Sequence, residues 1–296
     1  MPASEMPAAE VVIDVDLVRR LLRSQHPDLA DLPIVELTNG WDNAIYRLGD
    51  ELTVRLPRRS LAADLVRNEQ RWLPMLADRL PLPIPAPVRA GEPEGDYPWA
   101  WSVCPWFAGD VAGASPPRDL RSAAAVLGGF LAALHRPAPE EAPDNRFRGG
   151  PLDERDESTL DRIAGIADLV DVDVVRSVWR AHVGLPPWTG EPRWLHGDLH
   201  PANLVVRDGE LAAVIDFGDL TSGDPATDLA VAWMLFASGA RTVLRAAAGE
   251  VDDATWARAR GWALSFAVIY VAFSADHPVL AAVGRRTLDE VIADAS

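Results

Sequence analysis

The chain has 296 residues, of which 48% are hydrophobic and 24% charged, and its 28 basic and 44 acidic residues give a net charge of −16. This composition is typical of a soluble globular protein, and its acidic balance disfavours nucleic acid and anionic lipid as partners. The charge is consistent with plain solubility and equally with attraction of a cationic substrate. All basic residues are arginine, which excludes a Walker A lysine and Schiff-base chemistry.

The sequence shows no targeting or membrane segment. Its first residues, MPASEMPAAEVVID, contain neither a basic n-region nor an apolar h-region, so we expect no signal peptide. The longest apolar run, residues 262–273, is too short to cross a bilayer. Cys104 is the only cysteine, which excludes an internal disulfide framework. We therefore expect a cytoplasmic protein with no membrane partner.

The first hundred residues predict a small lobe rich in β-strands. Apolar spacing indicates helices over residues 14–26 and about 62–79. Between them, strand-like runs with turn residues at their ends predict an antiparallel meander of three strands, Ile34–Thr38, Ala44–Leu48 and Leu52–Leu56. Alternating prolines then extend residues 80–88, and the sequence WAWSVCPWF predicts a further strand.

The rest of the chain predicts a larger and mostly helical lobe. The Gly/Ala/Pro-rich stretch Gly109–Pro117 indicates a hinge, so we expect lobes of residues 1–108 and 109–296. Helices are expected over residues 119–135, 158–183, 226–247, 253–273 and 278–294. One β-hairpin interrupts them, with strands Leu204–Val206 and Ala212–Ile215 joined at Asp208-Gly209.

The sequence just before this hairpin contains two histidines four residues apart, His196 and His200. This spacing is that of the zinc motif H-E-x-x-H, which requires a helix and a glutamate after the first histidine. Gly197 follows the first histidine and Pro201 follows the second, so a helix is disfavoured here. The pattern therefore argues against a zinc site.

Phosphoryl transfer explains the same stretch better. Residues 196–203, HGDLHPAN, match the kinase catalytic loop H-x-D-L-x-x-x-N, in which the aspartate accepts the substrate proton and the asparagine holds magnesium. Asp216-Phe217-Gly218 follows the predicted hairpin and matches D-F-G. The hairpin would return Asp216 beside Asp198 and Asn203, giving Mg²⁺ the oxygen ligands that it prefers. Polar turn residues at strand ends are the alternative, but two motifs in the right order make it weaker.

HGDLHPANLVV, VIDFGD and GDPATDLA together resemble the aminoglycoside phosphotransferase family, the antibiotic-kinase branch of the protein-kinase-like fold. The resemblance implies an α+β, two-lobed protein-kinase-like fold and transfer of a nucleotide γ-phosphate to a small-molecule hydroxyl. By position, Asp198 resembles the catalytic aspartate, and Asn203 and Asp216 resemble the magnesium ligands. Asp228 resembles the buried aspartate that braces the catalytic loop, although a charge at a helix start would look the same.

The first lobe shows candidates for binding the nucleotide, ATP or GTP. Arg55, in LTVRLP, stands where kinases carry a strand lysine, and Glu69 on the next helix is its expected partner. Asn43 ends a hairpin, residues 39–43, that either covers the phosphates or is an ordinary turn. Pro105 and Phe107 resemble the segment that contacts adenine through its backbone.

The acceptor is expected to be a small molecule. No A-P-E follows Asp216 and no long activation loop fits before GDPATDLA, which argues against a protein kinase. The net charge and the acidic stretch 153–157 suit a cationic antibiotic, with an aminoglycoside first, although such a stretch is more often a solvated face. Alternatives are kinases of a macrolide, a peptide antibiotic, or a choline-like or other metabolite, and a non-catalytic pseudokinase. His200 either faces the phosphates or packs.

Overall fold

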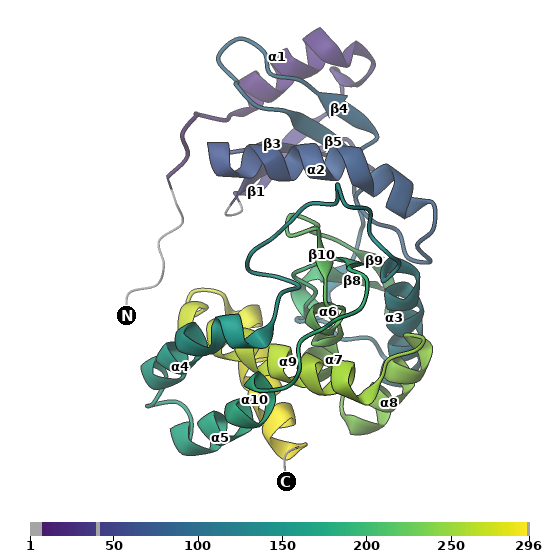
Figure 1. The fold of residues 1–296 in the computed structure, drawn as a ribbon. Coiled ribbons are helices and arrows are strands. Elements are labelled where there is room, and N and C mark those ends of the chain that lie inside the picture. Colours follow the sequence, from purple (N-terminus) through teal and green to yellow (C-terminus); the bar gives the residue numbers. More distant parts are fainter. Residues whose placement is uncertain (1–7, 40–41, 295–296) are drawn as a thin grey trace. The chain divides into compact units, whose positions relative to one another are not determined.

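The structure is a computed structural model that describes residues 8–39 and 42–294 (Figure 1). Contacts divide these residues into two compact units. The first contains the chain up to Arg79 together with Pro83–Ala108, and the second contains Leu80–Leu82 and the residues from Gly109 onward. The assignment of nucleotide binding to one lobe and acceptor binding to the other stays a prediction.

The first unit is built on an antiparallel sheet of five strands in the order β1-β2-β3-β5-β4 (Figure 1). Its elements are α1 (Val15–Gln25), the short 3-10 helix Pro27–Leu29, β1 (Ile34–Asn39), β2 (Asn43–Leu48), β3 (Leu52–Pro57), α2 (Ser60–Ala77), β4 (Arg89–Gly91) and β5 (Trp101–Pro105). The predicted meander is β1-β2-β3, paired in antiparallel register. Alternation along β2 buries Tyr46 and Leu48 against Leu21 and Leu22 of α1.

The second unit is mostly helical. Its helices are α3 (Leu120–Leu134), α4 (Asp156–Gly165), α5 (Val172–Val183), α6 (Ala226–Leu229), α7 (Val231–Leu235), α8 (Ser238–Ala247), α9 (Asp253–Phe273) and α10 (Pro278–Ala293), with 3-10 turns at Leu152–Arg155 and Pro201–Asn203. Helix α9 contacts α4, α5, α6 and α10. It is apolar on most sides, as expected of a helix surrounded by others, and it forms the centre of this unit.

Two predicted helices are wrong in their continuity. The expected helix over 158–183 is two helices, α4 and α5, because the Asp171 side chain accepts from the amides of Asp173 and Val174 and so starts a new helix. The expected helix over 226–247 is divided into α6, α7 and α8. Phe236, with φ −115° and ψ 140°, leaves the helical conformation before α8 begins.

Short strands in the second unit place the catalytic loop. The predicted hairpin is present as β8 (Leu204–Arg207) and β9 (Glu210–Val214), and its turn residues Asp208 and Gly209 have φ of 56° and 82°. Strand β6 (Asp110–Val111), inside the predicted hinge, pairs with β8. Strands β7 (Arg193–Leu195) and β10 (Thr221–Gly223) pair with each other, which the sequence did not predict. The described residues contain no helix long and apolar enough to span a membrane.

Candidate active site

The loop from His196 to Asn203 connects β7 to β8 and carries the predicted catalytic Asp198. Gly197 has φ 86°, a conformation that favours glycine. A Cβ atom at this position would lie 2.1 Å from the carbonyl oxygen of Asp219. The loop therefore packs closely on the segment after the D-F-G sequence, and it requires glycine at position 197.

Asp228 fixes the start of this loop. Its side chain is fully buried, and its two carboxylate oxygens accept from the amides of His196, at 2.8 Å, and Gly197, at 2.9 Å. The Nε2 atom of His135, at the end of α3, lies 3.2 Å from Asp228 Oδ2. A buried carboxylate that accepts two amides holds a backbone more firmly than a neutral side chain does. Asp228 thus connects the catalytic loop to α6 and α3.

Both histidines of the loop are used in its internal hydrogen bonds. The His196 ring lies 2.9 Å from the Ile215 carbonyl through Nε2 and accepts from the Asp198 amide through Nδ1, at 3.2 Å. The Nδ1 atom of His200 accepts from the Ala202 amide, so its Nε2 carries the proton and lies 3.4 Å from Asp198 Oδ2. His196 therefore braces the loop, and His200 faces the predicted catalytic carboxylate.

The two predicted magnesium ligands lie in adjoining segments. Asn203 Nδ2 donates to the Asp198 carbonyl at 2.9 Å, and the Ile215 amide donates to the Asn203 carbonyl at 2.9 Å. Asp216, the next residue, has φ 64°, a strained conformation that aspartate tolerates better than most residues. Together, Asn203 and Asp216 offer the amide and carboxylate oxygens that suit Mg²⁺, which keeps several water or phosphate ligands. The described residues contain no group of three or more His, Cys, Asp and Glu side chains that could hold a metal.

Asp198 lies between positively charged and hydrogen-bonding groups. Arg148 Nη2 donates to Asp198 Oδ1 at 3.1 Å. Burial alone would raise the pKa of Asp198, but His200, Arg148 and His196 outweigh it and hold this pKa well below its usual range. Asp198 is therefore ionised at neutral pH.

Four residues that the sequence did not predict surround Asp198: Arg148, Asp219, Asn145 and Tyr270. Arg148 Nη2 also lies 3.0 Å from Asp219 Oδ2, and Asn145 Nδ2 donates to Asp219 Oδ1 at 2.8 Å. Burial raises the pKa of Asp219, and Arg148 opposes this rise. The phenol of Tyr270 is buried without a hydrogen-bond partner among the described residues, and its ring lies edge-on to His200 at 5.5 Å. Asn145 and Arg148 lie in a loop whose sequence has no periodicity that could have indicated their role.

In the other unit, Arg55 and Glu69 are brought together. Arg55 Nη1 lies 3.1 Å from Glu69 Oε1, and both side chains are almost fully buried. The pair joins β3 to α2, as the kinase comparison predicted. Cys104, which faces the pair from β5, is buried, and burial raises its pKa to about 12. This thiol is therefore protonated and unreactive at neutral pH.

The remaining predicted nucleotide-binding residues lie at strand ends. Asn43 begins β2, and its Oδ1 atom is buried without a hydrogen-bond partner within the described residues. Pro105 ends β5 opposite Leu52, and Phe107 follows it in a segment without regular structure. The hairpin loop expected over 39–43 includes residues 40–41, which lie outside the described residues.

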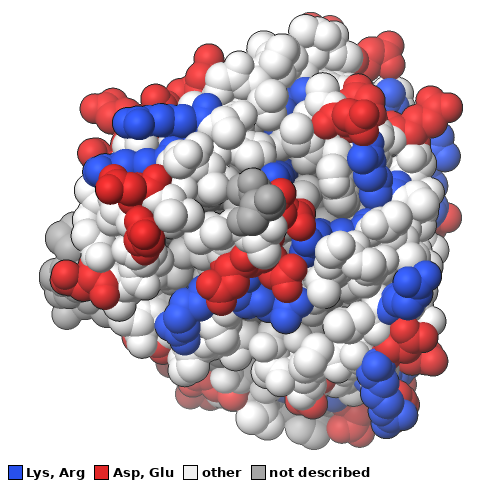
Figure 2. All heavy atoms as spheres, turned by 90° about the horizontal axis from the view of Figure 1, so that it is seen from below, with Lys and Arg blue, Asp and Glu red and all other residues white. Residues whose placement is uncertain are grey.

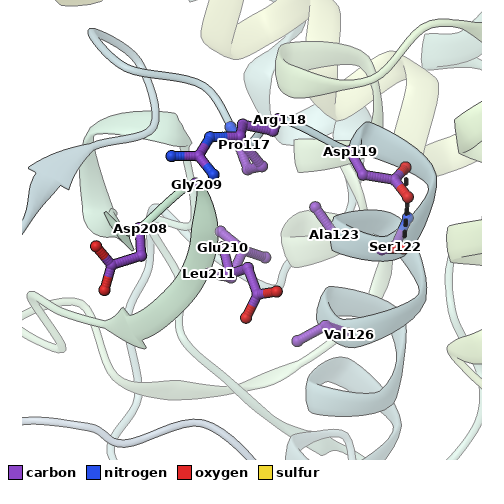
Figure 3. Close-up of a pocket in the computed structure, with 10 residues that line it drawn as sticks. All are labelled: Pro117, Arg118, Asp119, Ser122, Ala123, Val126, Asp208, Gly209, Glu210 and Leu211. Carbon is purple, nitrogen blue, oxygen red and sulfur yellow. Dashed lines mark hydrogen bonds between the residues drawn. The ribbon is translucent and has the colours of Figure 1, made fainter.

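A pocket of about 330 Å³ lies in the second unit between the start of α3 and the turn of the β8–β9 hairpin (Figure 3). Arg118, Asp119 and Glu210 are among the side chains that line it. Asp119 caps α3 by accepting from Ser122, as the dashed line in Figure 3 shows. None of the predicted site residues lines this pocket.

The chain matches a known protein family in sequence and several solved structures in fold. Residues 33–262 match the sequence model of a family described as the phosphotransferase enzyme family. The chain is similar to the GDP complex of wild-type aminoglycoside 2'-phosphotransferase-IIIa, at 22% identity and TM-score 0.69, over 96% of this chain and 100% of the other. It is also similar to the gentamicin complex of APH(2'')-IIa, at 17% identity and TM-score 0.61, over 95% of this chain and 97% of the other.

A third similar structure is the macrolide 2'-phosphotransferase MphH from Brachybacterium faecium. Its identity is 21% and its TM-score 0.62, over 93% of this chain and 98% of the other. At this level of identity the likeness concerns the fold. It confirms the predicted α+β class, with an antiparallel sheet in the first part of the chain and a helical second part.

Proposed function

The chain belongs to the phosphotransferase enzyme family, and on this basis we propose that it transfers the terminal phosphoryl group of a nucleoside triphosphate to a hydroxyl group of a small molecule. The observation that carries the proposal is a pair of hydrogen bonds that join the backbone segments of three predicted site residues. Asn203 donates to the Asp198 carbonyl and accepts from the Ile215 amide, so Asp198, Asn203 and Asp216 lie on adjoining backbone segments. These are the residue types that phosphoryl transfer requires in that order.

In this mechanism Asp198 orients the acceptor hydroxyl group and takes its proton. The hydroxyl oxygen forms a bond to the terminal phosphorus as the bond from that phosphorus to the bridging oxygen breaks, and the nucleoside diphosphate leaves. Asp198 can act as the base because its carboxylate is ionised and 29% exposed. His200 Nε2 holds Asp198 Oδ2, so the carboxylate keeps one orientation while it accepts the proton.

Asn203 and Asp216 are the residues that would hold Mg²⁺. When bound, the ion would neutralise negative charge on the nucleotide phosphates. In the other unit, Arg55 would contact the α- and β-phosphates, and Glu69 fixes the direction of its guanidinium group. Asn43, Pro105 and Phe107 are proposed to contact the nucleotide, ATP or GTP. Solved relatives in complex with GDP, ADP and ATP support a nucleotide donor.

An antibiotic is the first candidate for the acceptor. Similar structures are named as aminoglycoside and macrolide phosphotransferases, so compounds of both classes belong in a test panel, with aminoglycosides first. Net charge alone does not decide between them. On the face drawn in Figure 2, acidic and basic side chains are interspersed and form no single acidic field among the described residues. A choline-like or other metabolite is the alternative acceptor.

The test is nucleotide turnover by the purified protein with aminoglycosides, macrolides and amino alcohols as acceptors. Asp198→Asn keeps the size of the side chain but removes the base, and we expect it to lower turnover by a factor of about 10² to 10⁴. Asp208→Asn is the matched control, because Asp208 is an exposed residue of the hairpin turn, and it should behave as the wild type. Equal turnover of the wild type and Asp198→Asn would refute the mechanism. Nucleotide binding without turnover of any acceptor would instead favour a pseudokinase.

A further inference from the structure

The second unit contains a group of three arginines, of which Arg148 contacts Asp198. Arg148 comes from the loop after α3, Arg155 ends the 3-10 turn before α4, and Arg162 lies on α4. The three are close enough that Arg148 and Arg162 both act on the charge of Arg155. Asp198 and Asp219 compensate the charge of Arg148, but like charges at Arg155 and Arg162 are costly unless an opposite charge lies near them.

Two of these guanidinium groups meet at one neutral oxygen atom. Arg155 Nη1 donates to the Phe147 carbonyl at 2.9 Å, and Arg148 Nη1 donates to the same carbonyl at 3.4 Å. A single carbonyl oxygen therefore accepts from two cations. This is the arrangement that a carboxylate or another compact anion satisfies better, because it offers more acceptor sites and a full negative charge.

The rest of Arg155 is held by neutral groups. Its Nε atom donates to Ser265 Oγ at 3.3 Å, and its guanidinium group lies 5.1 Å from the centre of the Trp262 ring. Among the described residues, no ion pair connects Arg155 or Arg162 to a carboxylate. Burial, reinforced by the charges of Arg148 and Arg162, lowers the pKa of Arg155 to about 10. Its charge is thus poorly compensated within the protein.

Arg148 is firmly positioned and faces the reaction site. The loop that carries it is anchored through Gly149, whose amide donates to Thr227 Oγ1 at 3.1 Å and whose carbonyl accepts from the Asp224 amide at 2.9 Å. The guanidinium of Arg148 lies over the Phe266 ring, and its Nε atom is buried without a hydrogen-bond partner within the described part of the chain. An acceptor placed at Asp198 would therefore meet Arg148 directly.

The carboxylates of the acidic stretch 153–157 form no ion pair with Arg148, Arg155 or Arg162 among the described residues. Asp153, Glu154 and Glu157 are exposed, and Asp156 Oδ1 accepts from the indole of Trp179 at 2.7 Å. The residue of this stretch that shares a hydrogen-bond acceptor with Arg148 is Arg155. The exposed carboxylates fit the solvated face that is the more common role of such a stretch.

We propose that the acceptor carries an anionic group, such as a carboxylate, that binds to Arg148 and Arg155 while its hydroxyl group faces Asp198. The proposal rests on the proposed phosphotransferase reaction, and it puts hydroxylated anions in place of aminoglycosides as the first acceptors to test. An acceptor with several ammonium groups would meet like charge at this end of the site, so Arg155 acts as a residue that determines specificity.

The test is a binding experiment that needs no turnover. Mandelate, mandelamide and phenylethanolamine share a phenyl ring and a hydroxyl group but are anionic, neutral and cationic. Calorimetric titration of each into the full-length wild-type chain should show mandelate binding about tenfold or more tightly than the other two. In Arg155→Gln the three affinities should become similar. Arg155→Lys, which keeps the charge, should retain part of the preference.

Arg146→Gln is the matched control, because Arg146 is an exposed arginine of the same loop, and it should keep the wild-type preference. The proposal is overturned if the wild type shows no preference for mandelate, if phenylethanolamine binds at least as tightly, or if the preference persists in Arg155→Gln. Circular dichroism establishes that each variant is folded. Because binding is measured without nucleotide turnover, loss of the preference and loss of phosphoryl transfer are separate results.

Discussion

Replacing Asp228 by asparagine is expected to weaken both folding and catalysis, although Asp228 touches no reacting atom. The carboxylate is fully buried and accepts from the amides of His196 and Gly197 with its two oxygens. In Asp228→Asn one oxygen becomes an NH₂ group. One of the two amides then faces a donor, and the buried site loses the negative charge that strengthened both hydrogen bonds.

The expected cost follows from these contacts. Loss of a hydrogen bond to a charged group costs about 1.5–3 kcal/mol, and an amide left buried without a partner costs about 1–3 kcal/mol. Because the loop can relax in part, we expect Asp228→Asn to lower the free energy of unfolding by about 2–4 kcal/mol. A shift of the loop by about 1 Å would also move Asp198 and reduce kcat by about a hundredfold.

The assay is urea unfolding followed by circular dichroism, together with kcat on the best acceptor of the panel. Asp119→Asn is the matched control, since Asp119 also accepts from two backbone amides, of Arg121 and Ser122, but is exposed. Water can replace its lost hydrogen bond, so the control should lose little stability and no activity. The reasoning is refuted if Asp228→Asn is as stable as the wild type, or if the two variants lose equal stability.

Three further predictions concern the second unit. Burial lowers the pKa of His182, so the unfolded chain binds its proton first as the pH falls below about 6.5. The free energy of unfolding should therefore decrease as the pH falls below about 6.5, by up to about 1.4 kcal/mol per pH unit. In His182→Gln the decrease should be smaller, and equal pH dependence of the two proteins in urea unfolding would contradict this. Gly197→Ala should lower Tm far more than Gly95→Ala. Both glycines have positive φ, but only a Cβ atom at position 197 would clash with the backbone, and similar Tm values in the two variants would disprove the clash. Arg241 is buried and pairs with Glu290 of α10 and with Asp294, which follows this helix, so Arg241→Met should cost about 2 kcal/mol or more in urea unfolding. Arg286→Met, at a half-exposed pair, should cost little, and equal costs would argue against the buried network.

The parts of the site that the sequence predicted are those that lie close together along the chain. Asp198 and Asn203 are five residues apart, and the hairpin that returns Asp216 has a turn sequence, Asp208-Gly209, with a known conformation. Local rules are sufficient for such a unit, because each step depends on neighbouring residues. The motif order also identified the family and the fold.

The contacts that the sequence did not predict are distant along the chain. Arg148 reaches Asp198 across 50 positions, and His135 reaches Asp228 across 93. Nothing distinguishes Arg148 from the other 27 arginines until the loop that carries it is anchored by tertiary contacts. The β7–β10 pair was missed for the same reason, since strands of three residues have no measurable period.

The residues proposed to carry the reaction, Asp198, Asn203 and Asp216, lie in one continuous stretch, so the family match is informative about phosphoryl transfer. In the proposal above, acceptor choice depends on Arg148 and Arg155, which come from a loop and a turn outside that stretch. Both are arginines, whose charge does not titrate near neutral pH, so their effect on acceptor choice should persist across the working range of the enzyme. The search for the acceptor should therefore vary the charge of the acceptor as well as include the compound classes named for similar structures.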